Sequence, residues 1–394
     1  MELSHEQKIE ELLTRGVSEV IDREHLKKRL LAGEKLRVKL GIDPTSPNLH
    51  LGRSVPLLKL RDFQDLGCDV VFIVGDFTGQ IGDTSDKESE RPMLSEQDVQ
   101  RNMESYLDQA AKILDPKKKP EIHHNSEWLE KLSFQRVGAL ADSFSVAEFT
   151  ARENIKKRLN EGKRVSLREM LYPLMQGYDS VEVNADVELG GTDQRFNLLA
   201  GRTLQKAWAQ EPQDILMTNL ILGTDGRKMS SSWGNTINLT DVPNDMFGKV
   251  MSIPDELIEG YFVHCTRVPM DEVKKVVAEP NPRDAKLRLA KEIVTLYHGA
   301  AEATKAEEYF VETFSKGQVP SEMPSVQAVE GMALTELLIA AGVATSKGEA
   351  RRKIEQGGVS INEEKTDDFT VVISKQHDSS VVKVGKKDFF RIVF

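Results

Sequence analysis

Residues 36–74 read LRVKLGIDPTSPNLHLGRSVPLLKLRDFQDLGCDVVFIV, and this stretch decides the fold. Residues 36–40 predict a β-strand, and the turn residues of 41–47 end it. Apolar side chains at helical spacing follow over 50–66, and the continuous apolar run 70–74 is typical of a strand buried in a parallel sheet. A strand, a helix and a second strand within about 40 residues indicate a βαβ unit, and hence an α/β fold.

The remaining pattern extends this fold in both directions. Residues 4–32 predict a long N-terminal helix, and 181–189 and 215–222 predict later strands of the same sheet. From 241 to 315 the apolar spacing is mostly helical, with one long helix expected over 283–314.

These patterns divide the chain into four segments. Two prolines among polar residues near 320 predict a linker, and the residues after it predict two short helices followed by short strands. We expect a Rossmann-like catalytic domain at 1–240, an α-helical domain at 241–320, a linker at 321–333 and a small α+β domain at 334–394.

Length and composition limit the class of protein. The chain has 394 residues, of which 39% are hydrophobic and 29% charged, as in globular enzymes of more than one domain. No apolar run reaches the roughly 18 residues of a membrane span, and the N-terminus lacks a signal-peptide core. Two cysteines, Cys68 and Cys265, are too few for a zinc cluster or a disulfide framework. We therefore expect a cytoplasmic enzyme with no membrane partner and no metal bound by protein ligands.

The net charge of −10 at first argues against a nucleic-acid partner, because phosphates need cationic surface. The charge is unevenly spread, however: residues 331–394 carry ten Lys and Arg against nine Asp and Glu. A local basic face is enough to bind RNA.

Two segments suit a triphosphate. His50, Gly52 and Arg53 begin the helix after the first strand, where free backbone N–H groups attract anions and glycine permits close approach. Lys228 and the hydroxyls of Ser230–Ser232 follow the last apolar strand in a loop suited to a pyrophosphate leaving group. Each segment alone is also typical of solvated surface, but both at strand ends indicate a nucleotide site.

A second set of residues suits an amino acid and a ribose. Tyr172, Gln176 and Asp179 share one helix face, which can bind an ammonium group at one end and a hydroxyl at the other. Gly191 belongs to a glycine pair that permits a ribose to approach, and the Asp193 carboxylate can accept from ribose hydroxyls.

Together these motifs resemble those of the bacterial tyrosyl-tRNA synthetases, a family of class I aminoacyl-tRNA synthetases. The segment His50-Leu51-Gly52-Arg53 resembles the first class I signature, with Arg53 in place of its second histidine. The segment Lys228-Met229-Ser230-Ser231-Ser232 resembles the second signature, with Ser231 in place of its second lysine. The pattern Tyr172-Pro-x-x-Gln176-x-x-Asp179 matches the substrate helix of the family.

The resemblance implies a homodimeric enzyme that activates L-tyrosine with ATP, accompanied by Mg²⁺, and transfers it to tRNA(Tyr). It implies that Asp179 binds the phenol hydroxyl and that Tyr172, Gln176 and Asp83 bind the α-amino group. The catalytic residues would be Thr45, His50, Arg53, Lys87, Arg91, Lys228, Ser230, Ser231 and Ser232. ATP would be bound by Gly41, Asp43, His50, Gly52, Gly191, Asp193, Lys228 and Met229, and tyrosine by Asp83, Tyr172, Gln176, Asp179 and Gln194.

One position departs from the usual pattern. Lys39 stands where many bacterial members place a second tyrosine that shares the substrate hydroxyl, as in the thermophile-like branch that also lacks this tyrosine. Asp179 is therefore expected to recognise the hydroxyl together with another donor, which the sequence does not name.

Residues 334–394 resemble the S4 domain, a small RNA-binding module. Lys347, Arg351 and Arg352 fall on adjacent turns of one expected helix and can contact successive phosphates. The resemblance implies that this segment binds tRNA.

Three alternatives stay open on the sequence alone. A tryptophanyl-tRNA synthetase shares the fold, although the substrate helix and the S4-like tail speak against it. A nucleotidyltransferase such as a pantetheine-phosphate adenylyltransferase lacks that tail. An RNA-binding relative without activity is kept open by the substitutions at Arg53 and Ser231.

Overall fold

The computed structural model describes residues 3–83, 93–315, 323–362, 364–385 and 388–394. The chain forms two compact units, residues 1–299 and 300–394. Each unit has a sheet of its own.

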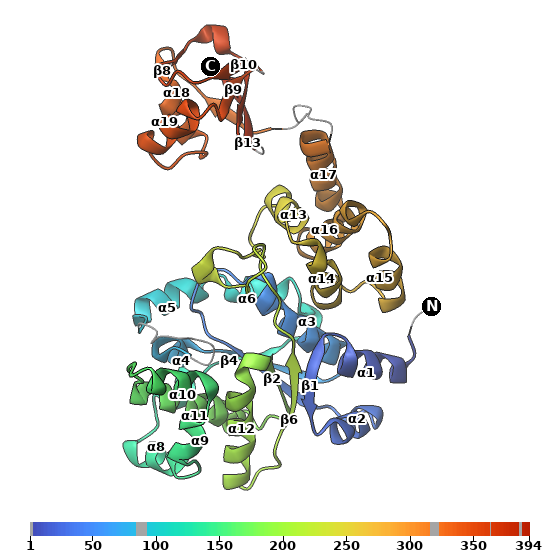
Figure 1. Cartoon of the computed structure of the whole chain (residues 1–394). Helices are drawn as coiled ribbons and strands as arrows, with labels where there is room; N and C mark the ends of the chain where they lie inside the picture. Colours follow the sequence, from blue (N-terminus) through green and yellow to red (C-terminus); the bar gives the residue numbers. More distant parts are fainter. Residues whose placement is uncertain (1–2, 84–92, 316–322, 363, 386–387) are drawn as a thin grey trace. The chain divides into compact units, whose positions relative to one another are not determined.

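The first unit contains a six-stranded sheet in the order β1-β6-β5-β2-β3-β4. Figure 1 labels four of these strands, β1, β2, β4 and β6. The strands from β6 to β4 in this order run parallel, and only the edge strand β1 is antiparallel to its neighbour β6. The predicted parallel sheet is therefore confirmed. The strands are β1 Val17–Ile21, β2 Arg37–Ile42, β3 Asp69–Val74, β4 Glu121–His124, β5 Val187–Gly191 and β6 Asp214–Thr218.

The strand order reverses between β2 and β5. From β2 the chain continues outward to β3 and β4, and it later returns to build β5 and β6 on the other side of β2. Right-handed crossovers in opposite directions place helices on opposite faces, which leaves a crevice at the carboxyl ends of β2 and β5. Helix α3 (Leu51–Asp65) packs on β2, β3 and β5, whereas α11 (Leu167–Glu182) and α12 (Arg195–Ala207) pack on each other and α12 on β5 and β6.

The other helices of this unit surround the sheet or follow it. They are α1 His5–Thr14, α2 Arg23–Leu31, α4 Asp76–Ile81, α5 Glu96–Met103, α6 Tyr106–Ala111, α7 Ser126–Leu129, α8 Phe134–Ala141, α9 Val146–Thr150, α10 Glu153–Asn160, α13 Pro243–Met251, α14 Ile258–Cys265, α15 Met270–Val277 and α16 Pro282–His298. None of the helices within the described ranges is long and apolar enough to span a membrane.

Several predictions of secondary structure are wrong in part, and the strand expected at 215–222 ends already at Thr218. The N-terminal helix is interrupted because Gly16 has φ +65° and the β-branched residues after it form β1 beside β6. The long helix expected at 283–314 ends at Gly299, where φ is +89°. The strand expected at 181–189 begins only at Val187, since α11 continues to Glu182.

The second unit is a small α+β domain. After α17 (Ala300–Phe310) it contains a five-stranded sheet, β10-β9-β12-β13-β7, and a two-stranded sheet, β11-β8, around a buried apolar core that includes both short helices. The predicted helices at 334–341 and 346–356 are confirmed as α18 Leu334–Ala340 and α19 Lys347–Glu355. The strands are β7 Ser325–Gln327, β8 Met332–Ala333, β9 Val359–Ile361, β10 Glu364–Thr366, β11 Val372–Ile373, β12 Val381–Val384 and β13 Asp388–Val393.

Part of the expected linker at 321–333 belongs to this unit. Residues 325–327 pair in parallel with β13, and residues 332–333 pair with β11, so backbone hydrogen bonds order them despite their linker-like composition. The four-part division of the chain stays a prediction.

Candidate active site

A cavity of about 510 Å³ lies at the carboxyl ends of β2 and β5, where the strand order reverses. Its walls contain all the residues predicted to bind tyrosine or ATP, and all the predicted catalytic residues except Lys87 and Arg91, which lie outside the described residues. The predicted residues that line it are Gly41, Asp43, Thr45, His50, Gly52, Arg53, Asp83, Tyr172, Gln176, Asp179, Gly191, Asp193, Gln194, Lys228, Met229, Ser230, Ser231 and Ser232.

Asp179 presents a buried carboxylate to this cavity from α11. The side chain of Trp128 donates from Nε1 to Asp179 Oδ1 (2.8 Å), and Asn125 donates from Nδ2 to Oδ2 (3.3 Å). Burial raises the pKa of Asp179 to about 7, although the Lys39 charge and these two hydrogen bonds act in the opposite direction. The group is thus poised to accept a hydrogen bond from a hydroxyl near neutral pH.

Asn125 and Trp128 are the residues that sequence reasoning missed. Asn125 directly follows β4, so its position after a predicted parallel strand is the signal that could have found it. Asn125 also lines the cavity, whereas Trp128 reaches Asp179 from α7. Neither residue belongs to a motif that predicts a binding site. Only the fold brings the two side chains next to α11.

A second carboxylate, that of the partly buried Asp43, anchors the turn after β2. It accepts from Thr78 Oγ1 (2.7 Å) and from the Tyr172 hydroxyl (2.9 Å), which joins this turn to α11. Burial raises the pKa of Asp43 to about 6 against the effect of these hydrogen bonds, and burial also raises the pKa of Tyr172. An added Cβ at Gly75 would lie 2.1 Å from Asp43 Oδ1, so glycine is needed there for close packing.

Lys39 does not take the place of the absent tyrosine at the cavity. It is fully buried, is not among the lining residues, and its Nζ lies 2.9 Å from Glu188 Oε1. Gln176, which does line the cavity, donates from Nε2 to the same oxygen (3.2 Å).

The start of α3 forms another wall. His50 is its N-cap, and burial together with the charges of Arg53 and Lys228 lowers the pKa of His50 to about 3, so the imidazole is neutral at physiological pH. An added Cβ at Gly52 would lie 3.0 Å from the His50 ring, and the Gly52 N–H points at Met229 Sδ (3.3 Å). A neutral imidazole at the positive end of a helix suits phosphate oxygens.

Arg53 is fixed in orientation by the turn after β2. Its guanidinium donates to the Asp43 carbonyl (2.9 Å), to Thr45 Oγ1 (2.6 Å) and to the Tyr106 hydroxyl (2.8 Å). These bonds leave a positioned positive charge at the wall of the cavity.

The loop of residues 228–232, called the Lys228 loop, forms a further wall of the cavity. Lys228 Nζ pairs with Asp193 Oδ2 (2.9 Å), and Asn235 accepts from the Ser230 backbone N–H (2.9 Å). Ser231 Oγ lies 3.5 Å from Ser46 Oγ, across from the turn after β2. Arg227, in contrast, pairs with Asp225 and stacks on Trp233, and it is not among the lining residues.

Asp83 and Gln194 also line the cavity and contact each other. Gln194 donates from Nε2 to Asp83 Oδ2 (2.7 Å). At Gly191 an added Cβ would lie 2.7 Å from Asp193 Oδ1, so a larger residue would crowd the ribose side of the cavity.

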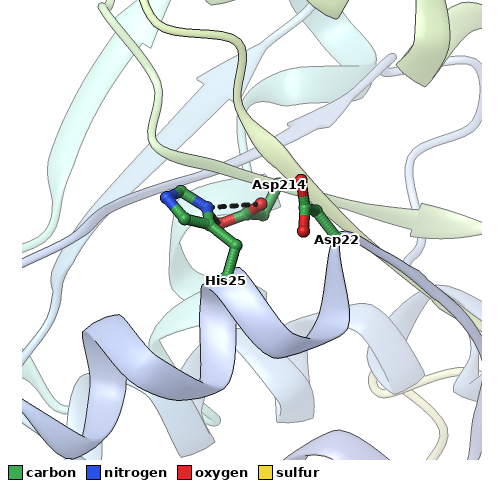
Figure 2. Close-up of side chains that lie close together, drawn as sticks. All are labelled: Asp22, His25 and Asp214. Atoms are coloured by element: carbon green, nitrogen blue, oxygen red, sulfur yellow. Dashed lines mark hydrogen bonds and ion pairs between the residues drawn. The ribbon is translucent and has the colours of Figure 1, made fainter.

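One group of side chains could hold a metal ion among the described residues, and it lies elsewhere. Asp22, His25 and Asp214 offer donor atoms within 4.8 Å of one another (Figure 2). Asp214 begins β6, whereas the cavity lies past the other end of that strand. The His25 Nδ1 lies 3.1 Å from Asp214, so the imidazole already contacts this buried carboxylate.

The predicted RNA-binding residues lie on α19 in the second unit. Lys347 pairs with Glu336 (2.7 Å), and Arg351 pairs with Glu355 (2.8 Å) and stacks over Phe369. Arg352 is exposed and forms no ion pair with any residue that the structure describes.

Two family models together match nearly the whole chain. One described as "tRNA synthetases class I (W and Y)" matches residues 31–315, and one described as "Tyrosine–tRNA ligase SYY-like C-terminal domain" matches residues 316–392. Among curated relatives, a tyrosine–tRNA ligase of Carboxydothermus hydrogenoformans is 47% identical over 98% of this chain and 97% of its own length. The tyrosine–tRNA ligase of Thermotoga maritima is 46% identical over 97% and 96%.

Solved structures agree with this fold. A truncated mitochondrial tyrosyl-tRNA synthetase of Coccidioides posadasii has a TM-score of 0.63 at 25% identity, over 76% of this chain and 90% of that one. An Archaeoglobus fulgidus tyrosyl-tRNA synthetase complexed with L-tyrosine has a TM-score of 0.60 at 23% identity, over 77% and 100%, which supports the fold alone.

Proposed function

The chain belongs to the tyrosine–tRNA ligases of the class I aminoacyl-tRNA synthetases, and from this premise we propose which residues perform each step. The enzyme activates L-tyrosine with ATP to tyrosyl-adenylate and pyrophosphate, and then transfers the tyrosyl group to the 3′ end of tRNA(Tyr). The observation that carries the assignment of roles is the buried Asp179 carboxylate in the cavity at the strand ends.

Asp179 accepts the hydrogen bond from the phenol hydroxyl of the substrate. Trp128 and Asn125 already donate to its two oxygens, so both stabilise the ionised form and fix its orientation. Phenylalanine lacks a hydroxyl and would leave this carboxylate buried without its third partner, which costs binding energy. A site built around a substrate hydroxyl therefore rejects the analogue that lacks it, and tyrosyl-tRNA synthetases are the standard example of this selectivity.

The substrate ammonium group binds between Tyr172, Gln176 and Asp83. All three line the cavity, and the Gln194 contact orients Asp83 toward it. The Tyr172 hydroxyl oxygen, the Gln176 amide oxygen and the Asp83 carboxylate provide one acceptor for each of the three N–H bonds of an ammonium.

ATP binds along the start of α3 and under the Lys228 loop. Gly52 and Gly191 leave room for the nucleotide, Asp193 accepts from the ribose, and Gly41, Asp43 and Met229 complete the wall. Thr45, His50 and Arg53 contact the phosphates. Mg²⁺ is proposed to arrive with ATP, since it binds phosphate oxygens and water more readily than a protein cage.

The reaction needs no protein nucleophile. The tyrosine carboxylate attacks the α-phosphorus, and the bond to pyrophosphate breaks as charge grows on the leaving group. Lys228, Ser230, Ser231 and Ser232 stabilise that charge, together with Lys87 and Arg91 outside the described residues. The tRNA hydroxyl then attacks the adenylate carbonyl, and AMP leaves.

The second unit binds the tRNA through Lys347, Arg351 and Arg352 on α19, and the proposed place of action is the cytoplasm. Phosphate contacts of this kind provide affinity that falls with salt.

We also propose a homodimer whose interface includes α8, α9 and α11, which all contribute buried residues to one apolar cluster of the first unit (Figure 1). Each of these helices begins with a large apolar side chain that is 79–94% exposed, namely Phe134, Val146 and Leu167. We propose that the partner protomer covers these exposed side chains. Sedimentation equilibrium of the unmodified protein and of Phe134→Glu tests it, and an unmodified protein that is monomeric at micromolar concentration would contradict it.

Amino-acid-dependent ATP–pyrophosphate exchange tests the function directly. Exchange is expected with tyrosine and not with tryptophan or phenylalanine, and charging of tRNA(Tyr) should follow. Exchange with tryptophan would point to the sister synthetase, and no exchange with any amino acid would point to an inactive RNA-binding relative.

A further inference from the structure

A buried ion pair lies behind the part of the cavity wall that Gln176 forms. The side chains of Lys39 and Glu188 are 0% and 1% exposed, and Lys39 Nζ lies 2.9 Å from Glu188 Oε1. Burying two charges costs several kcal/mol each unless further hydrogen bonds satisfy them. We therefore ask what function offsets the desolvation cost of an ion pair next to a binding site.

The required hydrogen bonds connect β2, β5 and α11. Lys39 Nζ donates to the Gln176 carbonyl (2.9 Å) and to Ser180 Oγ (2.8 Å). Ser180 Oγ in turn donates to Glu188 Oε2 (3.1 Å), and Gln213 Nε2 donates to the same oxygen. With all these partners, neither charge is left uncompensated.

Packing leaves this network little freedom. An added Cβ at Gly201 of α12 would lie 2.4 Å from Gln213 Nε2, 2.9 Å from Ser180 Oγ and 3.2 Å from Glu188 Oε2. Close packing of this kind restricts side chains to one arrangement.

The network determines which way the Gln176 amide faces. Gln176 Nε2 lies 3.2 Å from Glu188 Oε1, and an ionised carboxylate can only accept. The amide nitrogen must therefore face Glu188, and the amide oxygen must face away from it. That oxygen, Gln176 Oε1, is buried and has no hydrogen-bond partner among the described residues, although the side chain lines the cavity.

We infer that Lys39 and Glu188 are positioning residues: the Glu188 carboxylate turns the amide oxygen of Gln176 toward the α-ammonium group of the substrate, and Lys39 compensates the charge of Glu188. This inference rests on the proposed function, in which Gln176 binds that ammonium. It also accounts for a lysine at position 39. The Lys39 ammonium contacts Glu188 behind the cavity wall and does not touch the substrate.

The test uses Glu188→Gln, which keeps the size of the side chain but introduces an amide. The new amide can donate to Gln176 Oε1, so the Gln176 oxygen is no longer reserved for the substrate. The matched control is Ser180→Ala, which removes another partner of both charges but leaves the contact between Gln176 and Glu188 in place. ATP–pyrophosphate exchange gives KM separately for tyrosine and ATP, and equilibrium dialysis gives Kd for L-tyrosine and for 3-(4-hydroxyphenyl)propanoate, which lacks the ammonium group.

We expect Glu188→Gln to raise KM and Kd for tyrosine about 10- to 100-fold, the value of one hydrogen bond to a charged group, with KM for ATP unchanged. Its Kd for 3-(4-hydroxyphenyl)propanoate should equal that of the unmodified protein. Ser180→Ala should lower the unfolding temperature and leave KM for tyrosine unchanged. If Glu188→Gln does not fold, the double variant Lys39→Met with Glu188→Gln, which removes both charges, carries the same expectation.

Two results would overturn the inference: an unchanged KM for tyrosine in folded Glu188→Gln, or an equal loss of affinity for both dialysis ligands. Absence of tyrosine-dependent exchange in the unmodified protein would instead refute the proposed function. Normal exchange in the unmodified protein with an unaffected Glu188→Gln refutes only the inference drawn from this ion pair.

Discussion

The hydrogen bond from Trp128 to Asp179 makes the pH dependence of tyrosine binding predictable. Trp128→Phe keeps an aromatic ring but removes the Nε1–H that donates to Asp179 Oδ1 at 2.8 Å. That bond favours the ionised carboxylate, so its loss must raise the pKa of Asp179 above its present value of about 7.

The size of the effect follows from the charge on the acceptor. A hydrogen bond to a charged group contributes about 1.5–3 kcal/mol, and about 1.4 kcal/mol corresponds to one pH unit, so the midpoint should move to roughly pH 8–9. At pH 7 the ionised fraction then falls from about one half to between roughly 1 and 10%, and kcat/KM for tyrosine falls roughly 5- to 50-fold. The loss should diminish as the pH rises, because more of the carboxylate ionises.

The assay is ATP–pyrophosphate exchange at subsaturating tyrosine from pH 6 to 9, since kcat/KM reports on the pKa values of the free enzyme. Trp208→Phe is the matched control: Trp208 Nε1 is buried and makes no hydrogen bond to any described residue, so the same chemical change removes no donor. A midpoint that does not move in folded Trp128→Phe, or that moves equally in Trp208→Phe, would refute the reasoning.

Three further predictions concern other parts of the molecule. Because burial holds the pKa of His50 near 3, His50→Asn should lower kcat of the exchange reaction without changing its pH profile between pH 5 and 8; loss of a limb near pH 6.5 would show that His50 titrates there. Gly201→Ala should cost about 1–3 kcal/mol in urea unfolding through overpacking, whereas Gly248→Ala in α13, where an added Cβ meets nothing within 4 Å, should stabilise the protein by about 0.5–1 kcal/mol. Equal effects of the two changes would contradict the packing argument. Arg352→Glu should weaken tRNA binding and reduce its salt dependence while tyrosine-dependent exchange stays unchanged, as filter binding and exchange assays can measure; unaltered tRNA affinity would remove α19 from the RNA contact.

Much of the fold was predictable because the relevant signals are local. The apolar run 70–74 and the turn residues 41–47 report on burial and backbone geometry over a few positions. The run forms β3 as predicted, whereas β2 continues through Ile42, so the turn begins two residues later than expected. The break at Gly16 was not predicted, because Val17, Val20 and Ile21 have spacing that fits a helix as well as a strand. These residues form a strand because they pair with β6, which lies about 200 residues away in the chain.

The sequence by itself determined the parallel sheet, the order of the motifs and the residue types that line the cavity, since strand ends of a parallel sheet must meet at one edge. Only the tertiary structure decided which groups lie behind that lining. The contacts of Trp128 with Asp179 and of Lys39 with Glu188 join residues that are distant in the chain, and neither pattern nor spacing encodes them. Their effect on pKa and on the orientation of Gln176 depends on burial and on distances of about 3 Å, which arise only when the packed elements enclose these side chains.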